Sequence, residues 1–532
     1  MAKHWGVQVA QGAVTINAFL MIAKGFGLVQ AVVIANRFGA GMAVDAYALA
    51  FSSIAFTLMA IPRDLLAPFL PVFTEERHRA GEQEAWRFAG AVGTWLALLI
   101  GAAAFLGFWH ADTLVRLVSQ FESEDANRLA ASLVRIMMPA VFFMALYWLA
   151  TLLMHAYKRF GPPAAAEVVN KIALIACILA LYAVLGIRAV AVGVALGALT
   201  ALLFPVLAFG KTLRLFRPSL DWKSPAMRSF GRLVLPILIG TLIAQSRVIL
   251  NYWFASGMGE GMTASLNYAK RLSDTIVLFV PFTVGTAIYP FFSEMTARKS
   301  MREAGTALAQ MLRLMALLFV PLSVGLGVLR VPAVQILFHH GAFTIENVYD
   351  TAAPFLFYTV GLVVLAWEIM LMRFYFSAKN TLTPIAIGLA CTALHVALVA
   401  WLRAPFGHAG IPMAETLSKG VKVLVLLALV RRIAPPGRFR DNAVFAVKLA
   451  AAAVVMGLTV QALGARLGIV YGVAESAGLV ARLRELGLPL VVCAGAGLLV
   501  FAAAAAALRI PEARLALDFA RTRLRRRTAG DR

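Results

Sequence analysis

Four cationic side chains lie inside long apolar segments of the chain: Lys24, Arg247, Lys270 and Arg271. A charge at the centre of a bilayer costs about 2.5–3.5 kcal/mol on insertion scales, so charges at that depth normally face a water-filled cavity or a partner. Cations with few acidic neighbours favour a cavity that binds an anion. Arginine suits a diphosphate because its planar guanidinium binds phosphate oxygens bidentately. The sequence therefore predicts an anion-binding site within a membrane.

Asp274 follows Lys270 by four residues and Arg271 by three, so its carboxylate can pair with either cation on one helical face. One interpretation is an ion pair within a helix near the membrane surface. Against it, two cations and one acid leave a net positive charge, and a charge at depth needs a function. We therefore expect this turn to bind the anion, with Asp274 in a supporting role.

Lys24 precedes Gly25 and Gly27, which let a ligand or another backbone approach closely. Alternatively, Lys24 lies near a helix end and extends its ammonium to the lipid headgroups. Arg247 is the equivalent cation in the first helix of the second half, and this correspondence favours a cavity role for both. Other charges within apolar segments are predicted to form structural ion pairs: Glu368 with Arg373, and Glu415 with Lys419.

A motif recurs in both halves of the chain with identical internal spacing: Ile61-Pro62 before Pro71-Val72-Phe73-Thr74-Glu75, and Val280-Pro281 before Pro290-Phe291-Phe292-Ser293-Glu294. A proline within a membrane helix is often a tolerated kink. A matched pair is better explained as two bends that break the second and eighth helices and let two bundles open and close. Arg63 and Asp64, beside Pro62, form either a buried pair or a gate.

The composition is that of a helical membrane protein. Of the 532 residues, 61% are hydrophobic and 14% are charged, and the mean hydropathy is +0.82. The formal charge of +23 would suit a nucleic-acid partner, but the basic residues lie in short loops and form no continuous basic domain. The three cysteines lie in apolar segments and predict no disulfide. The sequence carries no paired-carboxylate site, metal cluster, nucleophile triad or Walker motif, so we expect no enzyme, catalytic residue, metal or cofactor.

A span of about 20 apolar residues per helix predicts an all-α polytopic membrane fold with about fourteen transmembrane helices. The basic loops and the arginine-rich tail after Arg509 alternate with acidic loops such as 122–125, which places both termini in the cytoplasm. The predicted helices span residues 13–36, 45–73, 87–109, 129–156, 163–186, 189–210, 230–256, 263–293, 307–330, 350–376, 382–402, 409–430, 442–464 and 486–508.

The repeat copies lie six helices apart and therefore share one orientation. Parallel repeats of this kind are typical of transporters built from two similar bundles with a substrate path between them. We expect a six-helix lobe in residues 1–215 and a second in 216–435. Two additional helices then occupy 436–508, and a basic cytoplasmic tail occupies 509–532.

Four stretches are distinctive beyond their hydropathy: Asn36-Arg37-Phe38-Gly39-Ala40-Gly41-Met42-Ala43-Val44-Asp45-Ala46-Tyr47, Leu337-Phe338-His339-His340-Gly341-Ala342-Phe343-Thr344, Tyr375 with Thr383-Pro384, and His408-Ala409-Gly410. Together they resemble the MurJ/MviN lipid II flippase family of the multidrug/oligosaccharidyl-lipid/polysaccharide exporter superfamily. The resemblance covers most of the first twelve helices. It implies the exporter fold, alternating access and a cationic cavity that takes the pyrophosphate of a polyprenyl-linked sugar. Arg271 and Asp45 match positions that the family uses, and Asp274 stands where it usually has an acid.

The chain departs from the family pattern at three places. Lys24 stands where the family has an arginine, Gln30-Ala31 replaces an Arg-Asp pair, and Phe56-Thr57-Leu58-Met59 replaces a stretch with two arginines. We therefore predict a flippase for a polyprenyl-pyrophosphate-linked glycan, with lipid II as the leading substrate. An exopolysaccharide or O-antigen-type repeat unit is the alternative.

Two other classes of function remain open. A drug or metabolite antiporter would favour cationic substrates and an acidic cavity, whereas a non-transporting scaffold would not depend on the cavity cations. The expected location is the bacterial inner membrane. The expected partners are an undecaprenyl-pyrophosphate-type glycan lipid, the bilayer and glycan-synthesis enzymes.

Overall fold

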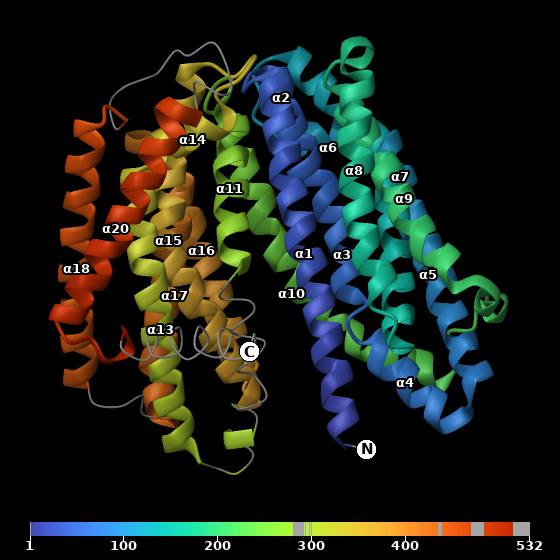
Figure 1. Ribbon diagram of the computed structural model, residues 1–532. Helices are drawn as coiled ribbons and strands as arrows, with labels where there is room; N and C mark the ends of the chain where they lie inside the picture. The colour runs from blue at the N-terminus through green and yellow to red at the C-terminus, as the bar shows by residue number, and fades with distance from the viewer. Residues whose placement is uncertain are drawn as a thin grey trace, which may run out of the picture. The chain divides into compact units, whose positions relative to one another are not determined.

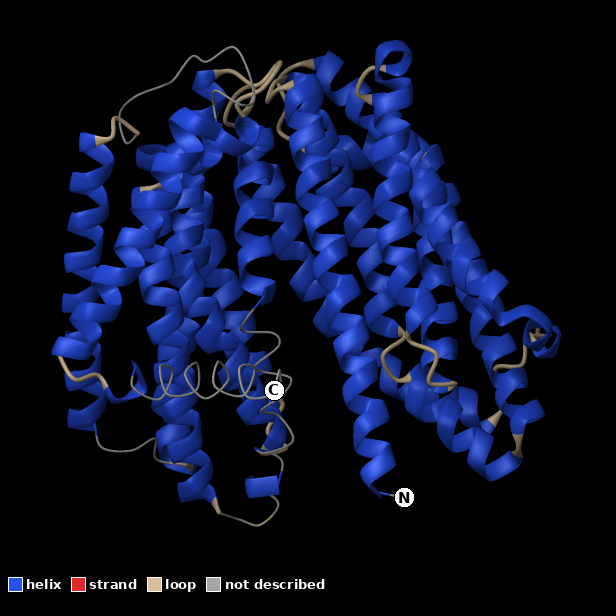
Figure 2. Cartoon of the chain, viewed as in Figure 1, coloured by secondary structure: helices blue, strands red, loops and turns tan. Residues whose placement is uncertain are grey.

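The computed structural model describes residues 2–279, 292, 294–296, 298, 300–434, 439–469 and 483–513. The regular structure in these ranges is entirely helical (Figure 2). Twelve helical stretches among the described residues are long and apolar enough to cross a membrane, and two of them, Met42–Ala80 and Leu382–Ile433, contain more than one helix. Helix α11 (Met262–Phe279) is a further candidate, whose apolar run is interrupted by three charged residues. The predicted all-α polytopic membrane fold is confirmed.

Packing divides the chain into two compact units. Unit 1 comprises Met1–Asn267 with Gly341–Phe343, and unit 2 comprises Tyr268–His340 with Thr344–Arg532. The seventh helix, α10 (Pro225–Ser256), begins the second sequence repeat but packs within unit 1 against α3 and the π-helix η1. Unit 1 also contains α1 (Ala2–Phe38), α2 (Met42–Ala48), η1 (Leu49–Ala55), α3 (Phe56–Leu65), α4 (Phe69–Ala80), α5 (Glu82–Trp109), α6 (Ala111–Val118), α7 (Glu124–Ala156), α8 (Gly161–Leu185), α9 (Arg188–Phe209) and the 3₁₀-helix η2 (Gly210–Leu215).

Within unit 1, α9 packs against both α7 and α8, while α1 packs on α8 and α5 packs on α7 (Figure 1). One end of the unit is closed by an aromatic core. Trp86 meets Phe209 edge to face with ring centroids 6.0 Å apart, and Phe88 meets Phe230 in the same way at 5.9 Å. These ring contacts hold the C-terminal end of α9 and the N-terminal part of α10 against α5.

The predicted helix over 45–73 is interrupted. Helix α3 ends at Leu65 and α4 begins at Phe69. Pro68 explains the break, because a proline disfavours helical backbone at the residue before it. Pro62 lies inside α3, which continues for three residues beyond it. Pro281, its predicted counterpart, lies outside the described residues.

Unit 2 is built around α15, which packs against α13 and α17. Helices α18 and α20 pair with each other, and α18 packs on α13 through a second apolar core that includes Phe445 and Met456. The unit contains α11 from Tyr268, α13 (Met301–Val328), α14 (Arg330–Phe338), α15 (Ile345–Ser377), α16 (Leu382–Phe406), the 3₁₀-helix η3 (Gly407–Ala409), α17 (Gly410–Ile433), α18 (Phe439–Arg466), the π-helix η4 (Leu483–Gly487) and α20 (Leu488–Ala507).

A close backbone approach fixes the linker between α9 and α10 onto α5. A Cβ atom added at Gly90 would lie 2.0 Å from the carbonyl oxygen of Arg217, which only a glycine permits. One turn further along α5, the hydroxyl of Thr94 accepts a hydrogen bond from the backbone N–H of Ser219 at 3.1 Å. The linker is therefore a fixed part of unit 1.

We predict that Gly90→Ala destabilises the protein. In an open helix, replacing glycine with alanine stabilises by about 1 kcal/mol, but at Gly90 the new methyl group would displace the linker backbone. Gly101→Ala is the matched control on the same helix, because its nearest neighbour, a ring carbon of Phe142, lies at 3.6 Å. Thermal unfolding in detergent at one scan rate should show a lower apparent Tm for Gly90→Ala only. An unchanged or higher Tm for Gly90→Ala would contradict the close approach.

Candidate functional site

The N-termini of α2 and α11 lie together in unit 1, and each is capped by a carboxylate from the segment of the other. The buried carboxylate of Asp45, on α2, accepts hydrogen bonds from the backbone N–H groups of Gly261 at 2.5 Å and Ala264 at 2.7 Å, at the start of α11. In return, the Glu260 carboxylate accepts from the backbone N–H of Met42 at 2.9 Å, at the start of α2. The first N–H groups of a helix have no partner within it, and a carboxylate stabilises that positive end.

A third segment joins these two. The backbone N–H of Ala342 donates to the carbonyl of Asn36 at 2.9 Å. Gly341 has a φ of +60°, and a Cβ atom there would lie 2.1 Å from the Asn36 side chain, so the position requires glycine. We call residues 36–45, 256–264 and 341–343 the clasp. Two of the four stretches that carry the family resemblance thus meet in one place.

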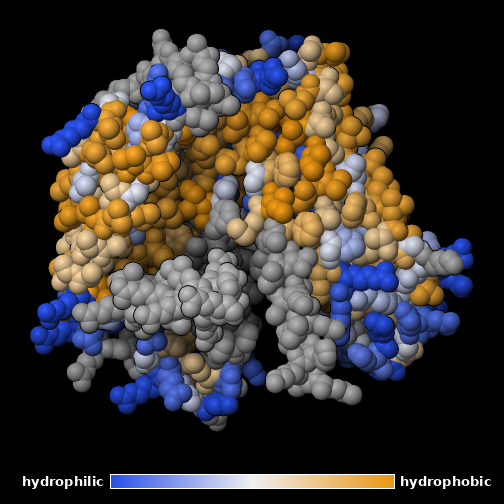
Figure 3. Space-filling view, in the orientation of Figure 1, coloured by the Kyte–Doolittle hydropathy of each residue, from blue (hydrophilic) through white to orange (hydrophobic). Residues whose placement is uncertain are grey.

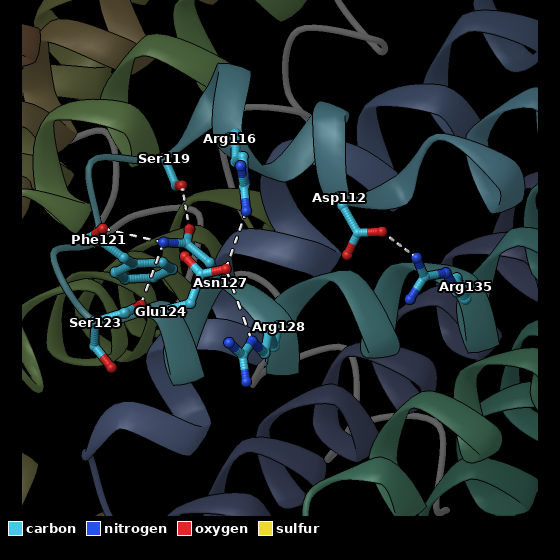
Figure 4. A network of polar contacts seen from close by, with 9 residues as sticks. All are labelled: Asp112, Arg116, Ser119, Phe121, Ser123, Glu124, Asn127, Arg128 and Arg135. Atoms are coloured by element: carbon cyan, nitrogen blue, oxygen red, sulfur yellow. Dashed lines mark hydrogen bonds and ion pairs between the residues drawn. The ribbon is translucent and has the colours of Figure 1, made fainter.

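The clasp is supported by a polar network between α6 and α7 (Figure 4). Glu124 accepts from Arg116 at 3.0 Å. The Asn127 side chain accepts from the Ser119 hydroxyl at 2.8 Å and donates to the Phe121 carbonyl at 3.1 Å. These contacts fix the connecting loop over residues 119–123.

The fixed loop contacts the clasp directly. The backbone N–H of Gln120 donates to the hydroxyl of Ser256, the last residue of α10, at 2.8 Å. Sequence reasoning did not predict this contact or the cap made by Glu260. The only local signal is the Gly259-Glu260-Gly261 turn directly before a helix.

Helices α3 and α10 face each other through polar side chains at membrane depth. Thr57 donates to Gln245 at 3.4 Å, and both side chains are buried. Further along, Asp64 accepts from Thr241 at 3.4 Å and from Arg63 at 3.0 Å. The Arg63 and Asp64 side chains are 43% and 32% exposed, so they form a partly open pair rather than a buried one.

The four predicted cations divide between the units. Half-buried Lys24 on α1 and Arg247 on α10 belong to unit 1, whereas Lys270 and Arg271 on α11 belong to unit 2. The Lys270 ammonium pairs with Asp274 at 2.5 Å and lies 5.5 Å from the centre of the Tyr358 ring on α15. This pair is one of the two that the spacing predicts, the other being Arg271 with Asp274. A single site that unites the four cations stays a prediction.

Two further ion pairs lie within the helices of unit 2. Lys419 pairs with Glu415 at 2.6 Å, as predicted from their spacing. Lys422 on α17 pairs with Glu368 on α15 at 2.6 Å, a partner that sequence reasoning missed. All four side chains are at most 20% exposed and carry balanced charge. Among the described residues, no group of three or more His, Cys, Asp and Glu side chains could hold a metal ion.

Known proteins resemble this chain over most of its length. The family model described as "Lipid II flippase MurJ" matches residues 34–475. A probable lipid II flippase MurJ of Bdellovibrio bacteriovorus is 28% identical over 407 residues, which is 75% of this chain and 77% of that protein. The lipid II flippase MurJ of Burkholderia cenocepacia is 27% identical over 465 residues, or 83% of this chain and 87% of that protein.

Solved structures agree on the fold. The structure of a lipid II flippase MurJ in an inward closed conformation superimposes with a TM-score of 0.73 at 19% identity, covering 90% of this chain and 98% of that chain. A multidrug resistance MATE family transporter of the MOP superfamily, in its inward-facing conformation, gives a TM-score of 0.68 at 16% identity, covering 79% and 97%. The family match spans the clasp and three of the four cations. The chain belongs to the MurJ lipid II flippase family.

Proposed function

We propose that this protein flips lipid II, the lipid-linked peptidoglycan precursor, across the bacterial cytoplasmic membrane. The observation that carries the proposal is the family match over residues 34–475, which contains every segment of the clasp together with Arg247, Lys270 and Arg271. The chain is a multi-pass membrane transporter and not an enzyme. An exopolysaccharide or O-antigen-type substrate is not favoured, since the curated relatives carry the lipid II flippase name.

The drug-antiporter alternative has less support. The MATE structures share the fold at 16% identity or below. This similarity supports a common architecture, but it is no evidence for a common substrate. A cationic drug would also be repelled by the cations on α1, α10 and α11.

We propose that the cations act on the diphosphate of the lipid head group. This group carries roughly two negative charges, and moving an unpaired ion into a low dielectric costs many kcal/mol. Arg271 offers a planar guanidinium to the phosphate oxygens, while Asp274 holds the neighbouring Lys270. Lys24 and Arg247 supply positive charge from unit 1, and the polyprenyl tail stays in lipid throughout.

The clasp has a proposed gating role. Helix α11 begins in unit 1, where Asp45 caps it, and continues from Tyr268 into unit 2, where it carries Lys270 and Arg271. Breaking the two bonds of Asp45 would release the start of the cation-bearing helix. We propose that alternating access uses this release, with Arg63 and Asp64 contributing as a gate at the end of α3.

We predict that Arg271→Ala abolishes or severely reduces flipping while the protein still folds and inserts. Charge-assisted hydrogen bonds contribute about 1.5–3 kcal/mol each, which is roughly ten- to a hundredfold in affinity. Arg271→Lys should retain part of the activity, because the charge survives and the planar fork does not. The assay is lipid II translocation in proteoliposomes.

The matched control for Arg271 is Arg298→Ala, which removes a 73% exposed arginine of the same unit that is paired with Glu294. Its flipping rate should equal that of the wild type. Wild-type flipping by Arg271→Ala would contradict the anion-binding mechanism, whereas absence of flipping by the wild-type protein itself would favour a non-transporting scaffold.

We predict that Asp45→Ala destabilises unit 1 and opens the start of α11. The substitution removes two charge-assisted hydrogen bonds from a buried site, worth about 1.5–3 kcal/mol each. Asp64→Ala is the control, because Asp64 is 32% exposed and its contact with Thr241 is long. A cysteine at the fully buried Ser265 should react with maleimide faster in the Asp45→Ala background only. Equal labelling rates in all three backgrounds would rule out the clasp as the element that holds α11.

We predict that both termini are cytoplasmic, from the distribution of basic loops. Helix α10 has 32 residues and so is about 48 Å long, and its last residue contacts the loop that holds Glu122. Cysteines at Glu122 and Ser229 should therefore lie on opposite membrane faces. An impermeant maleimide should label position 122 in intact cells and position 229 only after permeabilisation. Labelling of both positions from outside, or of position 229 alone, would overturn this topology.

A further inference from the structure

The linker between α9 and α10 has one face within unit 1 and one face outside it. Phe209, Phe216 and Phe230 pack into the aromatic core around Trp86. A different set of large apolar side chains is exposed: Leu207 in the last turn of α9 at 76%, and Leu220 and Trp222 in the linker at 59% and 61%. One tryptophan and two leucines therefore stay at the surface, although other large apolar side chains of the same segment are buried in the adjacent core.

Basic side chains alternate with these exposed apolar ones. Five of them are exposed along the linker and the first two turns of α10: Arg214, Arg217, Lys223, Arg228 and Arg232. Within the described residues, none of the five forms an ion pair with a carboxylate. Asp221, the acid of the linker, accepts from the backbone N–H groups of Lys223 at 3.0 Å and Ser224 at 3.2 Å. The surface therefore carries a net positive charge in a fixed arrangement.

The position of the linker sets its depth. Its 15 residues, 210–224, connect the end of one membrane-spanning helix to the start of the next. Its backbone is held on α5 at Gly90 and Thr94. Figure 3 shows hydrophilic surface directly below the hydrophobic band of unit 1, on the right of the view. A segment placed there lies at the level of the lipid headgroups, where tryptophan rings gather and basic side chains meet phosphates.

We propose that the linker and the helix ends beside it, residues 207–232, form a binding surface for the headgroups of anionic phospholipids. The exposed leucines and Trp222 enter the boundary of the acyl chains, and Arg214, Arg217 and Lys223 contact the headgroup phosphates. The Lys223 ammonium lies 5.7 Å from the centre of the Trp222 ring, so a single lipid headgroup can contact both side chains. A soluble acidic protein would make no use of the exposed leucines, whereas a bilayer surface uses both kinds of side chain.

The test uses the quenching of Trp222 by lipids that carry bromine near the headgroup. The full-length protein is placed in nanodiscs containing brominated phosphatidylglycerol or brominated phosphatidylcholine. Because the chain has nine tryptophans, the signal of the Trp222→Phe protein is subtracted. We expect the phosphatidylglycerol lipid to quench Trp222 at a lower mole fraction than the phosphatidylcholine lipid. R214Q/R217Q should raise the mole fraction of half-quenching at least about fivefold for phosphatidylglycerol only.

The control variant is R79Q/R87Q, which also removes two arginines from exposed sites of unit 1. These arginines have glutamate neighbours, Glu76 at 2.8 Å and Glu84 at 3.7 Å, and should leave the quenching unchanged. Equal quenching by both lipids in the wild type would overturn the proposal. So would an equal effect of R79Q/R87Q, since the preference would then come from overall charge. The assay measures no flipping, so its outcome is independent of the proposed transport function.

Discussion

The constraint on which this structure depends is that a charge inside a bilayer must be compensated. Unit 2 meets it with ion pairs. Glu368 with Lys422 and Glu415 with Lys419 are pairs of opposite charge at no more than 20% exposure. In the turn that carries Lys270, Arg271 and Asp274, the ammonium of Lys270 pairs with the carboxylate of Asp274 at 2.5 Å. Pairs of this kind maintain the fold, and we propose that Arg271 serves the anionic head group.

The same requirement applies to the backbone, because the first N–H groups of every helix need acceptors. At the clasp, α2 and α11 receive carboxylates from each other's segments, and Asn36 accepts from Ala342 of a third segment. Each of these bonds joins residues far apart in the sequence. The residues that make the family recognisable are therefore also the ones that hold the start of the cation-bearing helix.

The sequence predicted the fold class and the membrane helices because hydropathy is a property of single segments. The predicted helix ends were less accurate where a polar turn extends a helix or interrupts it. Helix α7 begins at Glu124 rather than 129, because Ser123 caps a polar first turn that hydropathy does not detect. The helix breaks at Pro68, between α3 and α4, whereas the repeated motif predicts the break at Pro62.

The candidate site was only partly predictable for a similar reason. Spacing rules detect pairs within one helix, and they gave Asp274 with Lys270 and Glu415 with Lys419. They cannot detect a partner on another helix, such as Lys422 for Glu368. Spacing rules also cannot detect a side chain that accepts hydrogen bonds from backbone N–H groups, as Asp45 does. Almost any residue can supply a backbone N–H, so the sequence carries no signal for the partner. Asp45 itself could be named from the family resemblance, but its partners Gly261 and Ala264 required the structure.

The central claim is that this chain moves lipid II, and a comparison of substrates with the purified wild-type protein tests it most directly. Proteoliposomes would be loaded with fluorescent lipid II or with a fluorescent polyprenyl-pyrophosphate-linked O-antigen unit, which share the diphosphate and differ in the glycan. Empty liposomes would give the rate without protein. We predict protein-dependent translocation of lipid II that is faster than translocation of the O-antigen unit. A faster rate for the O-antigen unit, or a lipid II rate equal to that of empty liposomes, would contradict the account.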